Sequence, residues 1–351
     1  MLHTRFKNDG IAVYKMTALQ KAARDAIAKK IVNNGYEMVE ESCPACGESE
    51  HAVLSQKDMY GLPMTVAVCQ ACDFVYTQKR LTDKSLIDFY DGEYRQLDRA
   101  VSGIDPFYAL QQRKGQLLYD FLKEHNFLKN TLAKSDFIVE IGCGAGGILH
   151  YFRDKGYSTV GCDFGSEYLN YGREKYDLTL IDGGLVELAP FFETPNRKPA
   201  IVIYEQVLEH IFNLDEELVE LKKLITPDTL LYIGVPGIRN LEHPRYEYDL
   251  LPFLQIPHLV HFDLQSLQKL MHRHGFELLE GNELVRAVFQ YKGDKIAPLK
   301  LKSNVPKMAA YFAEMEQKRG KLEQLKTIFF PYFWGKKMAK KVEGRVRQMM
   351  K

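Results

Sequence analysis

The chain has 351 residues, enough for two or more domains with a sizeable core, and its 46% hydrophobic and 26% charged residues are typical of a globular protein. No run of eighteen apolar residues occurs, and the first ten residues lack the apolar core of a signal peptide, which argues against a membrane-spanning helix and favours a cytoplasmic location. The formal net charge of +1 is unevenly spread, because residues 292–351 carry 16 Lys and Arg against 5 Asp and Glu.

Two helical regions lie on either side of a cysteine-rich segment. Residues 1–40 contain TALQKAARDAIAKKIV, whose apolar residues share one face, so we interpret them as a helical extension without chemistry of its own. Residues 80–130 predict a helical connector that includes FYALQQRKGQLLYDFLKEH. Tyr90, Tyr94 and Arg95 precede the next domain, and Tyr94 is a candidate contact to a ligand bound there. Packing of these tyrosines at helical spacing is the alternative.

Four cysteines between these regions form two C-x-x-C pairs, CPACG and CQACD, separated by 22 residues. Two such pairs place four thiolates around one Zn²⁺, and because cysteine fills all four positions the ion should be structural. Pairs of buried or redox-active cysteines are the alternative, and a disulfide framework is disfavoured in the cytoplasm. We therefore predict a zinc ribbon over residues 41–79, with the ligands Cys43, Cys46, Cys69 and Cys72.

A glycine cluster follows an apolar, β-branched run in FIVEIGCGAGGILHYFRDKGYSTVGCDF. Gly142, Gly144 and Gly147 fit G-x-G-x-x-G at a strand-to-helix turn, a pattern shared by dinucleotide and S-adenosylmethionine sites. Glu140 separates the two classes, because its charge would repel a pyrophosphate but favour the ammonium and sulfonium of S-adenosylmethionine. Asp163, at the end of the second strand, is placed to accept hydrogen bonds from ribose hydroxyls. The stretch therefore predicts a site for S-adenosylmethionine.

Strands and helices continue to alternate beyond this unit. LTLID predicts a third strand, AIVIYEQV a fourth that ends at Glu205 and Gln206, and TLLYIGV a fifth. FELLEG and LVRAVFQ supply further strands around a helix that should be capped by Asp263. This order predicts an α/β domain over residues 131–291 with a Rossmann-like, seven-stranded mixed sheet.

The successive motifs resemble those of class I S-adenosylmethionine-dependent methyltransferases: the glycine turn with Glu140, then Asp163, the LEH at residues 208–210, and LITPDTLLYIGVPG. With the four-cysteine ribbon and FYDGEY in front, the order is similar to that of bacterial methyltransferases of nucleotide-sugar and surface-polysaccharide pathways, including deoxysugar C-methyltransferases. The resemblance covers roughly residues 43–290. It implies donor binding at the motif positions, and the predicted donor set is Tyr94, Glu140, Gly142, Cys143, Gly144, Asp163, Phe164, Asp182, Gly183, Glu205 and Gln206.

Two departures from the family pattern bear on this expectation. Where many relatives carry an aspartate for the adenine amino group, this chain offers Gly183 and Gly184, with Asp182 shifted. Only a short basic tail follows Gln290, where the deoxysugar C-methyltransferases carry a long carboxy-terminal domain. O-methylation is therefore favoured over C-methylation.

An irregular segment after the fifth strand, residues 236–262, predicts a lid for the methyl acceptor. Methyl transfer needs a base for the acceptor proton, and this segment contains three histidines. His258 falls on the final histidine of a Y-x-E-H segment in the sugar methyltransferases and is our first candidate, followed by His261 and His243. Pro257 stands where the family has glutamate, so the base lacks its orienting carboxylate unless Glu209 or Glu242 supplies one from elsewhere.

The basic region over residues 292–351 combines helical patches with the aromatic cluster TIFFPYFW. It predicts contact with an anionic membrane surface at the inner face of the membrane, with a lipid-linked glycan or with RNA, or docking on the acidic remainder of the protein. We favour docking.

The expected function is methyl transfer to a small-molecule or glycan substrate, a nucleotide-linked or surface-polysaccharide sugar, with S-adenosylmethionine as donor and structural Zn²⁺. The first alternative is an RNA methyltransferase that uses the ribbon and tail to bind nucleic acid, and the second is a non-catalytic scaffold that retains the donor fold. Neither an NPPY-like tetrapeptide nor a Pro-Cys nucleophile follows the fourth strand, which disfavours methylation of base nitrogens or pyrimidine carbons.

Overall fold

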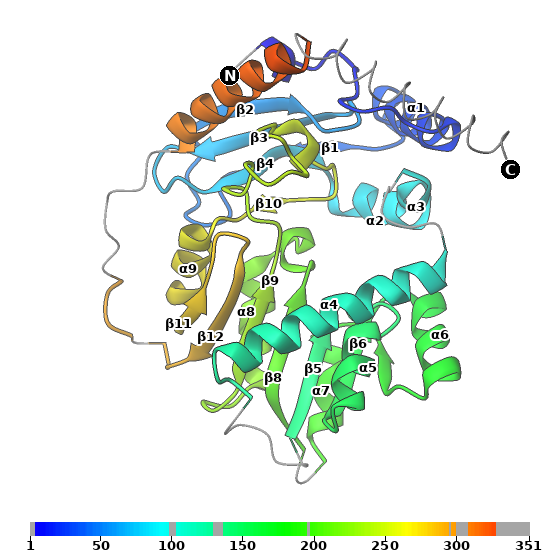
Figure 1. The fold of residues 1–351 in the computed structure, drawn as a ribbon, viewed down its shortest axis with the longest axis vertical. Coiled ribbons are helices and arrows are strands. Elements are labelled where there is room, and N and C mark those ends of the chain that lie inside the picture. Colours follow the sequence, from blue (N-terminus) through cyan, green and yellow to red (C-terminus); the bar gives the residue numbers. More distant parts are fainter. Residues whose placement is uncertain are drawn as a thin grey trace, which may run out of the picture.

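The computed structural model describes residues 4–97, 103–128, 136–194, 197–294, 296–299 and 308–327. These residues build two sheets, a seven-stranded sheet in the lower half of Figure 1 and a five-stranded antiparallel sheet above it. The carboxy-terminal residues 328–351, which include most of the aromatic and basic cluster, lie outside the described part of the chain.

The seven-stranded sheet has the strand order β11-β12-β9-β8-β5-β6-β7. Its five strands from β9 to β7 are parallel, and β12 and β11 are added at the opposite edge, each pairing antiparallel with its neighbours. The predicted seven-stranded mixed sheet is therefore confirmed. Its strands are β5 Asp136–Ile141, β6 Ser158–Asp163, β7 Leu180–Asp182, β8 Lys198–Glu205, β9 Leu230–Gly234, β11 Phe276–Gly281 and β12 Arg286–Tyr291.

Helices cover both faces of this sheet, because neighbouring residues of each central strand point to opposite sides. Along β5, Ile138 joins the core that contains α4, α5 and α6, while Val139 joins the core that contains α7, α8 and α9. Burial on both faces explains why these strands are continuously apolar. The helices are α4 Ile104–Glu124, α5 Gly147–Asp154, α6 Ser166–Tyr176, α7 Leu185–Phe192, α8 Leu214–Leu224 and α9 Leu264–Arg273.

The upper sheet has the order β1-β4-β3-β2, and the short strand β10 also pairs with β4. Its elements are β1 Met38–Glu40, β2 His51–Lys57, β3 Pro63–Cys69, β4 Val75–Leu81 and β10 Val260–His261, with the helices α1 Ala18–Val32, α2 Asp83–Asp91 and α3 Tyr94–Leu97 beside them. Short 3-10 turns lie at η1 Thr4–Phe6, η2 Leu208–His210 and η3 Leu251–Phe253. Because β10 comes from the segment predicted as a lid, that segment is hydrogen-bonded into the upper sheet.

Residues 236–262 are packed more tightly against the upper sheet and its helices than we expected of a lid. Ile238, Leu254 and Ile256 are buried in one core with side chains of the first 97 residues. Burial of these apolar groups stabilises the segment, at roughly 25 cal/mol per Å² of apolar surface removed from water. Its first residues leave the seven-stranded sheet at the end of β9, and its last residues return to the end of β8, where β10 contacts η2.

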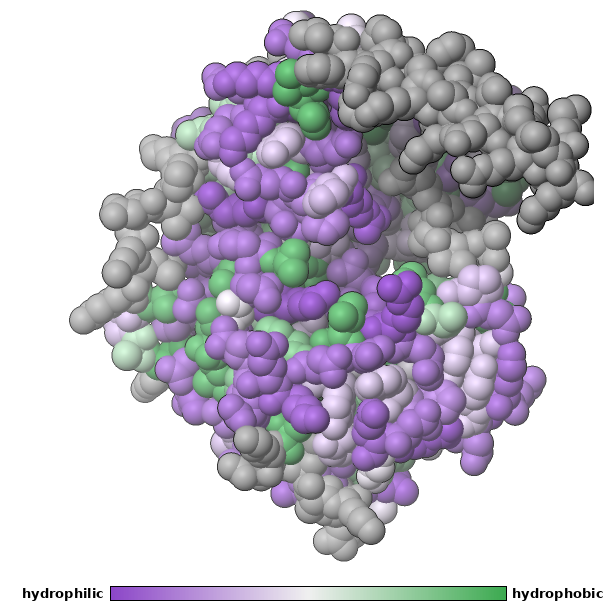
Figure 2. Space-filling view, in the orientation of Figure 1, coloured by the Kyte–Doolittle hydropathy of each residue, from purple (hydrophilic) through white to green (hydrophobic). Residues whose placement is uncertain are grey.

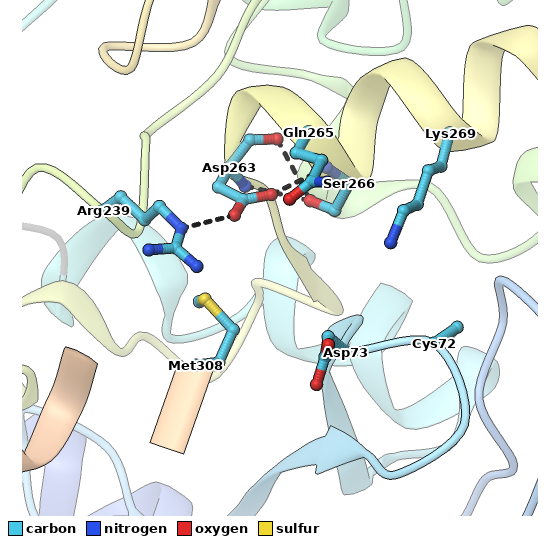
Figure 3. Close-up of a pocket in the computed structure, with 8 residues that line it drawn as sticks. All are labelled: Cys72, Asp73, Arg239, Asp263, Gln265, Ser266, Lys269 and Met308. Atoms are coloured by element: carbon cyan, nitrogen blue, oxygen red, sulfur yellow. Dashed lines mark hydrogen bonds and ion pairs between the residues drawn. The ribbon is translucent and has the colours of Figure 1, made fainter. Parts of the chain in front are cut away.

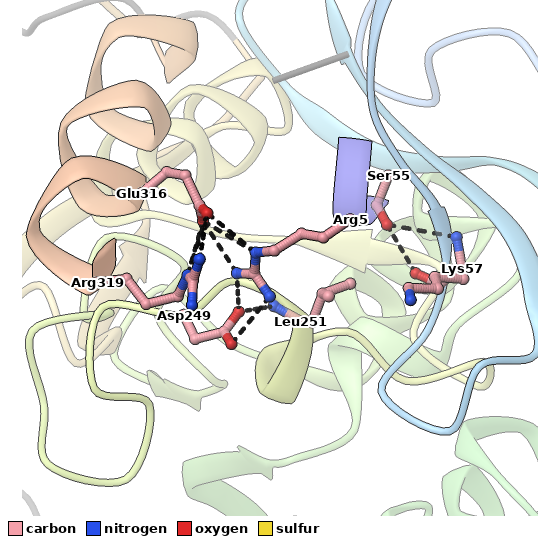
Figure 4. A network of polar contacts seen from close by, with 7 residues as sticks. All are labelled: Arg5, Ser55, Lys57, Asp249, Leu251, Glu316 and Arg319. Atoms are coloured by element: carbon pink, nitrogen blue, oxygen red, sulfur yellow. Dashed lines mark hydrogen bonds and ion pairs between the residues drawn. The ribbon is translucent and has the colours of Figure 1, made fainter. Parts of the chain in front are cut away.

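The basic region docks on the rest of the protein where it is described. Residues 308–327 form a helix, drawn in orange and red across the top of Figure 1, and Met308, Phe312 and Met315 are buried in the same core. Figure 4 shows how Arg5 joins this helix to residues 236–262, the insertion that follows β9. Arg5 Nη1 donates to Asp249 Oδ2 at 3.1 Å, and Nε donates to Glu316 Oε1 at 3.0 Å.

Two further ion pairs, Lys318 to Glu242 and Lys326 to Glu247, join the same helix to acidic residues of the insertion. Docking of the tail on acidic neighbours therefore holds for residues 308–327. Among the described residues, no helix combines the length and hydrophobicity needed to cross a membrane. The face in Figure 2 is mainly hydrophilic, with hydrophobic residues in small groups between polar ones.

Candidate functional site

The glycine turn after β5 needs residues without side chains at two positions. Gly142 has a φ of +68°, and a Cβ on it would lie 2.5 Å from Val207 Cγ2. Gly144 has a φ of +53°, and a Cβ there would lie 2.8 Å from Gln111 Nε2. Both the backbone conformation and the close approach therefore require glycine, as expected where a backbone turn faces a ligand.

Helix α4 fixes this turn from the outside. The Gln111 side chain donates from Nε2 to the Cys143 carbonyl at 2.9 Å and accepts from the Gly147 N–H at 3.2 Å. One buried amide thus holds both ends of the loop. Sequence reasoning gave this helix no chemistry, although Gln111 shares an apolar stripe with Tyr108 and Leu118, and a polar residue on such a stripe is a usable signal.

Glu140 is almost fully buried at the end of β5, with 1% of its surface exposed, and its Oε2 has no hydrogen-bond partner among the described residues. Burial raises the pKa of Glu140 well above its ordinary value, and the charge of Glu205 adds to this rise while Lys114 opposes it. Lys114, on α4, forms an ion pair with Glu205 at 3.3 Å. A buried acid with a second acid beside it is suited to bind a cationic ligand group.

Asp163 ends β6 and already accepts two backbone hydrogen bonds, from the Gly144 N–H and the Gly165 N–H, both at 2.8 Å. These bonds tie the second strand to the glycine turn, and each carboxylate oxygen keeps a further lone pair. Phe164 is 80% exposed beside Asp163, an unusual position for a phenyl ring unless a ligand covers it. Asp182 pairs with Asp163 in the strand register and is exposed, and Gly183 follows it.

Gln206 lies at the carboxyl end of β8 in a left-handed conformation, with a φ of +63°. Its backbone N–H donates to the Gly234 carbonyl at 2.7 Å, which holds the strained residue in place. Tyr94 packs with its ring against Phe89 and Tyr90. The structure thus brings the predicted donor residues of β5, β6, β7 and β8 to one edge of the sheet, while Tyr94 lies in an aromatic group of α2 and α3.

A second group lies at the same edge, after β8. Ligand atoms of Glu209, His210 and His258 all lie within 4.8 Å of one another, and the two imidazole rings are 4.8 Å apart. Two hydrogen bonds to the backbone position His258. The Leu259 N–H donates to the Glu209 carbonyl at 2.8 Å, and the Thr77 hydroxyl donates to the His258 carbonyl at 2.7 Å. The insertion and β4 together therefore carry His258 to the end of β8.

Burial dominates the electrostatics of this group. It raises the pKa of Glu209 to about 8, with a further rise from the charge of Glu205, and lowers the pKa of His210 to about 4. Burial also lowers the pKa of His258 well below its ordinary value, and the neighbouring His210 and His261 add to this effect. Both cluster imidazoles are therefore neutral near pH 7, and a neutral imidazole has a lone pair to accept a proton or bind a metal.

The structure separates the other histidine candidates from this group. His261 contacts the Thr77 hydroxyl through Nε2 at 3.3 Å, and its ring lies 6.3 Å from that of His258. His243 is exposed and accepts a hydrogen bond from the Arg245 N–H at 3.1 Å. Of the two carboxylates considered for orientation, Glu209 lies beside His258, whereas Glu242 pairs with Lys318.

A sequence model of the family described as "Methyltransferase domain" matches residues 101–280, which include the glycine turn, Asp163 and the histidine group. The chain belongs to this methyltransferase-domain family. It is similar to the C-methyltransferase NovU of Streptomyces niveus, with 26% identity over 218 residues that cover 62% of this chain and 47% of that protein. The chain thus spans about half the length of this curated relative.

Solved structures with a likeness to the chain include an O-methyltransferase family protein from Burkholderia thailandensis, at 13% identity and a TM-score of 0.41, covering 59% of this chain and 63% of that one. Another is magnesium protoporphyrin IX methyltransferase from Synechocystis PCC 6803, at 15% identity and a TM-score of 0.41, covering 60% and 100%. Neither likeness carries an inference about the substrate.

Next to the methyltransferase sheet, the four predicted metal ligands lie together. Cys43 Sγ and Cys72 Sγ are 3.6 Å apart, Cys46 Sγ and Cys69 Sγ are 3.5 Å apart, and all four sulfurs lie within 4.8 Å of one another. A tetrahedral ion with Zn–S bonds of about 2.3 Å places sulfurs about 3.8 Å apart, whereas a disulfide needs about 2.05 Å. The cluster therefore fits zinc, and it offers no ligand position for a substrate.

Replacing one of these thiols tests the zinc cluster independently of the methyltransferase domain. We expect Cys46→Ser to lose most bound zinc and to lower Tm by about 5 °C or more, because structural zinc contributes several kcal/mol and each kcal/mol corresponds to about 2–4 °C in a chain of this size. Elemental analysis and thermal unfolding measure both effects. Ser49→Ala, an exposed change near the same knuckle, is the control, and unchanged zinc content in Cys46→Ser would contradict the assignment.

Near this cluster, a cavity of about 30 Å³ lies between Cys72, Arg239 and the beginning of α9, with Arg239 pointing to Asp263 (Figure 3). The buried ion pair of Arg239 Nε with Asp263 Oδ2, at 2.7 Å, closes one side of it. A space of this size holds about one water molecule. It is therefore too small for a methyl donor or an acceptor.

The close packing around the glycine turn predicts that alanine is tolerated less well at Gly142 than at a loosely packed glycine. Gly142→Ala should destabilise the fold and weaken donor binding. The alanine would have to adopt a left-handed backbone conformation, which costs about 1–2 kcal/mol, and its methyl group would collide with Val207. Gly156→Ala is the matched control, since Gly156 has a φ of +90° but no atom within 4 Å of the added Cβ. Thermal unfolding of both variants would show equal losses if the contact with Val207 did not matter.

Proposed function

We propose that the chain transfers a methyl group from S-adenosylmethionine to a sugar, either nucleotide-linked or part of a surface polysaccharide, and that a hydroxyl oxygen is the acceptor. The observation that carries this proposal is the position of two buried groups at one edge of the sheet. Glu140 lies under the glycine turn, and one of its oxygens has no hydrogen-bond partner in the described chain. The Glu209–His210–His258 group lies after β8, the strand beside β5 in the sheet.

The donor half of the site is explained by charge. S-adenosylmethionine carries an ammonium and a sulfonium and no phosphate, so Glu140 and Glu205 would stabilise it and repel a dinucleotide. Lys114 now neutralises Glu205, and the donor ammonium would compete for that carboxylate. The exposed face of Phe164 and the remaining lone pairs of Asp163 are suited to the adenine and the ribose hydroxyls.

The acceptor half requires a group that takes up one proton. During transfer, the acceptor oxygen forms a bond to the methyl carbon as the carbon–sulfur bond breaks, and the hydroxyl proton moves to the neutral imidazole of His258. Glu209 lies beside this imidazole and takes the orienting role that Pro257 cannot supply. The active site would release S-adenosylhomocysteine and the methyl ether.

Methylation at carbon is the second candidate, because the similar protein from Streptomyces niveus is described as a C-methyltransferase. The same base would then remove a proton from the carbon beside a carbonyl group. The chain spans only about half of that relative's length, and the sugar assignment itself rests on the resemblance of the motifs. An RNA acceptor would predict binding that weakens steeply with salt.

Labelled methyl transfer tests the acceptor class. Full-length protein is incubated with methyl-labelled S-adenosylmethionine and cell extract separated into nucleotide-sugar, glycan and RNA fractions. We expect label in a sugar-containing fraction, and NMR of the product then distinguishes a methyl ether from a carbon-bound methyl group. Label confined to RNA would overturn the sugar proposal, and label on carbon would overturn its O-methyl form.

A further inference from the structure

We propose that Glu209, His210 and His258 form a binding site for one divalent transition-metal ion, separate from the four-cysteine cluster. One carboxylate and two imidazoles are a common ligand set for such ions, and they leave coordination positions open. The ligand atoms lie within 4.8 Å of one another, and Glu209 Oε1 is 3.9 Å from His210 Nε2. Ligands of one ion lie about 3 Å apart, so closure needs side-chain movements of about 1 Å.

The first supporting observation is the orientation of His210. Its Nδ1 lies 3.1 Å from the Pro257 carbonyl, which can only accept a hydrogen bond, so the proton must be on Nδ1 for this bond to form. The Tyr90 hydroxyl lies 2.7 Å from the same nitrogen, and with the proton on Nδ1 its oxygen accepts from that N–H. Nε2 then carries the lone pair and faces Glu209. A metal-binding histidine commonly donates its other N–H to a carbonyl in this way.

The second observation is the lack of partners for the remaining ligands. Glu209 is 2% exposed, and neither of its oxygens accepts a hydrogen bond from any residue in the described ranges. A buried carboxylate without a partner costs free energy, which a bound cation would offset. The described chain also provides no hydrogen bond to a ring nitrogen of His258, a residue that is 7% exposed.

The neighbouring charges act on the group from both sides. Lys114 and Glu205, whose charges act on Glu209, pair with each other, whereas the positive charge of Arg245 acts on His258 and opposes a cation there. Mn²⁺, Co²⁺ and Zn²⁺ accept mixed nitrogen and oxygen ligands, whereas thiolate clusters select zinc over manganese.

The proposed metal site does not depend on the identity of the acceptor, but a bound ion would occupy the lone pair of His258. In the ion-bound protein the lone pair of His258 is a metal ligand, so its proposed role as base applies to the ion-free protein. Binding of the ion and transfer of the methyl group are measured separately. Failure of one proposal is therefore distinguishable from failure of the other.

The test is a Mn²⁺ titration of the full-length protein after treatment with a chelator that leaves zinc in the cysteine cluster, with free Mn²⁺ followed by electron paramagnetic resonance. We expect one bound Mn²⁺ per chain, and a loss of affinity of about tenfold or more in Glu209→Gln and in His258→Ala. His272→Ala, which removes an imidazole of α9 outside the group, is the control and should bind Mn²⁺ normally.

Thermal unfolding shows whether a variant loses Mn²⁺ binding merely because it is unfolded. Glu209→Gln removes a buried carboxylate that accepts no hydrogen bond from the described residues, so the metal-free variant should be folded and retain its zinc. Added Mn²⁺ should raise Tm of the original chain and not of this variant. Absence of Mn²⁺ binding to the original chain, or equal binding by the folded Glu209→Gln variant, would overturn the proposal.

Discussion

Glu140→Gln is expected to weaken S-adenosylmethionine binding about 10²- to 10³-fold, because truncating one partner of a buried charge pair costs about 2–5 kcal/mol and each 1.4 kcal/mol is tenfold in affinity. Calorimetric titration of the full-length protein measures this loss. The amide keeps the size of the side chain, so the glycine turn and Asp163 remain in place.

The same substitution should leave the donor-free fold as stable as before or more stable. Burial raises the pKa of Glu140 above the ordinary value of 4.5, so the carboxyl lowers stability progressively as pH rises above that value, whereas an amide does not. The Tm difference between variant and original chain should therefore grow with pH. Glu174→Gln, an exposed change on α6, is the control, and unaltered donor affinity in Glu140→Gln would refute the donor-site assignment.

His258→Ala is expected to lower the rate of methyl transfer by about 10²- to 10⁴-fold, the usual contribution of a positioned proton acceptor. The Kd for S-adenosylmethionine should stay within about twofold, because the proposed donor residues lie on β5, β6 and β8 and not on the insertion. Single-turnover rates and donor titrations measure the two effects independently. A variant with reduced donor affinity and unchanged single-turnover rate at saturating donor would contradict this account.

His272→Ala is the matched control for this substitution. The His272 imidazole also makes a hydrogen bond, between Nε2 and the Ala297 carbonyl at 2.8 Å, but it lies on α9 and outside the histidine group. Equal loss of activity in both variants would indicate a general effect of removing an imidazole. Selective loss in His258→Ala would support a direct role in the reaction.

The sheet and the donor edge are predictable from sequence because their signals are local. Glu140, the glycines and Asp163 lie within one strand-turn-helix-strand unit, and the apolar runs that surround them read as buried parallel strands. The cysteine pairs are similarly local, since each knuckle fixes two ligands. Such short-range patterns determine which side chains reach the carboxyl edge, whatever the rest of the chain does.

The acceptor side was less predictable because its contacts join distant segments. Gln111 and Lys114 come from a helix that precedes β5, and they reach the donor edge only because α4 packs across α5. Glu209 meets His258 only because β10 pairs with β4 of the upper sheet. Periodicity within a segment cannot reveal such pairings, and the same limit explains why His243 was grouped with His258.

A crystal structure of the full-length protein with S-adenosylhomocysteine would test the central claim most directly, since that claim joins the donor edge and the histidine group into one active site. We expect the amino group at Glu140 and Glu205, in place of Lys114, the ribose at Asp163, and the sulfur facing the Glu209–His210–His258 group. A ligand whose sulfur faces away from that group, or whose amino group lies far from Glu140, would contradict the account.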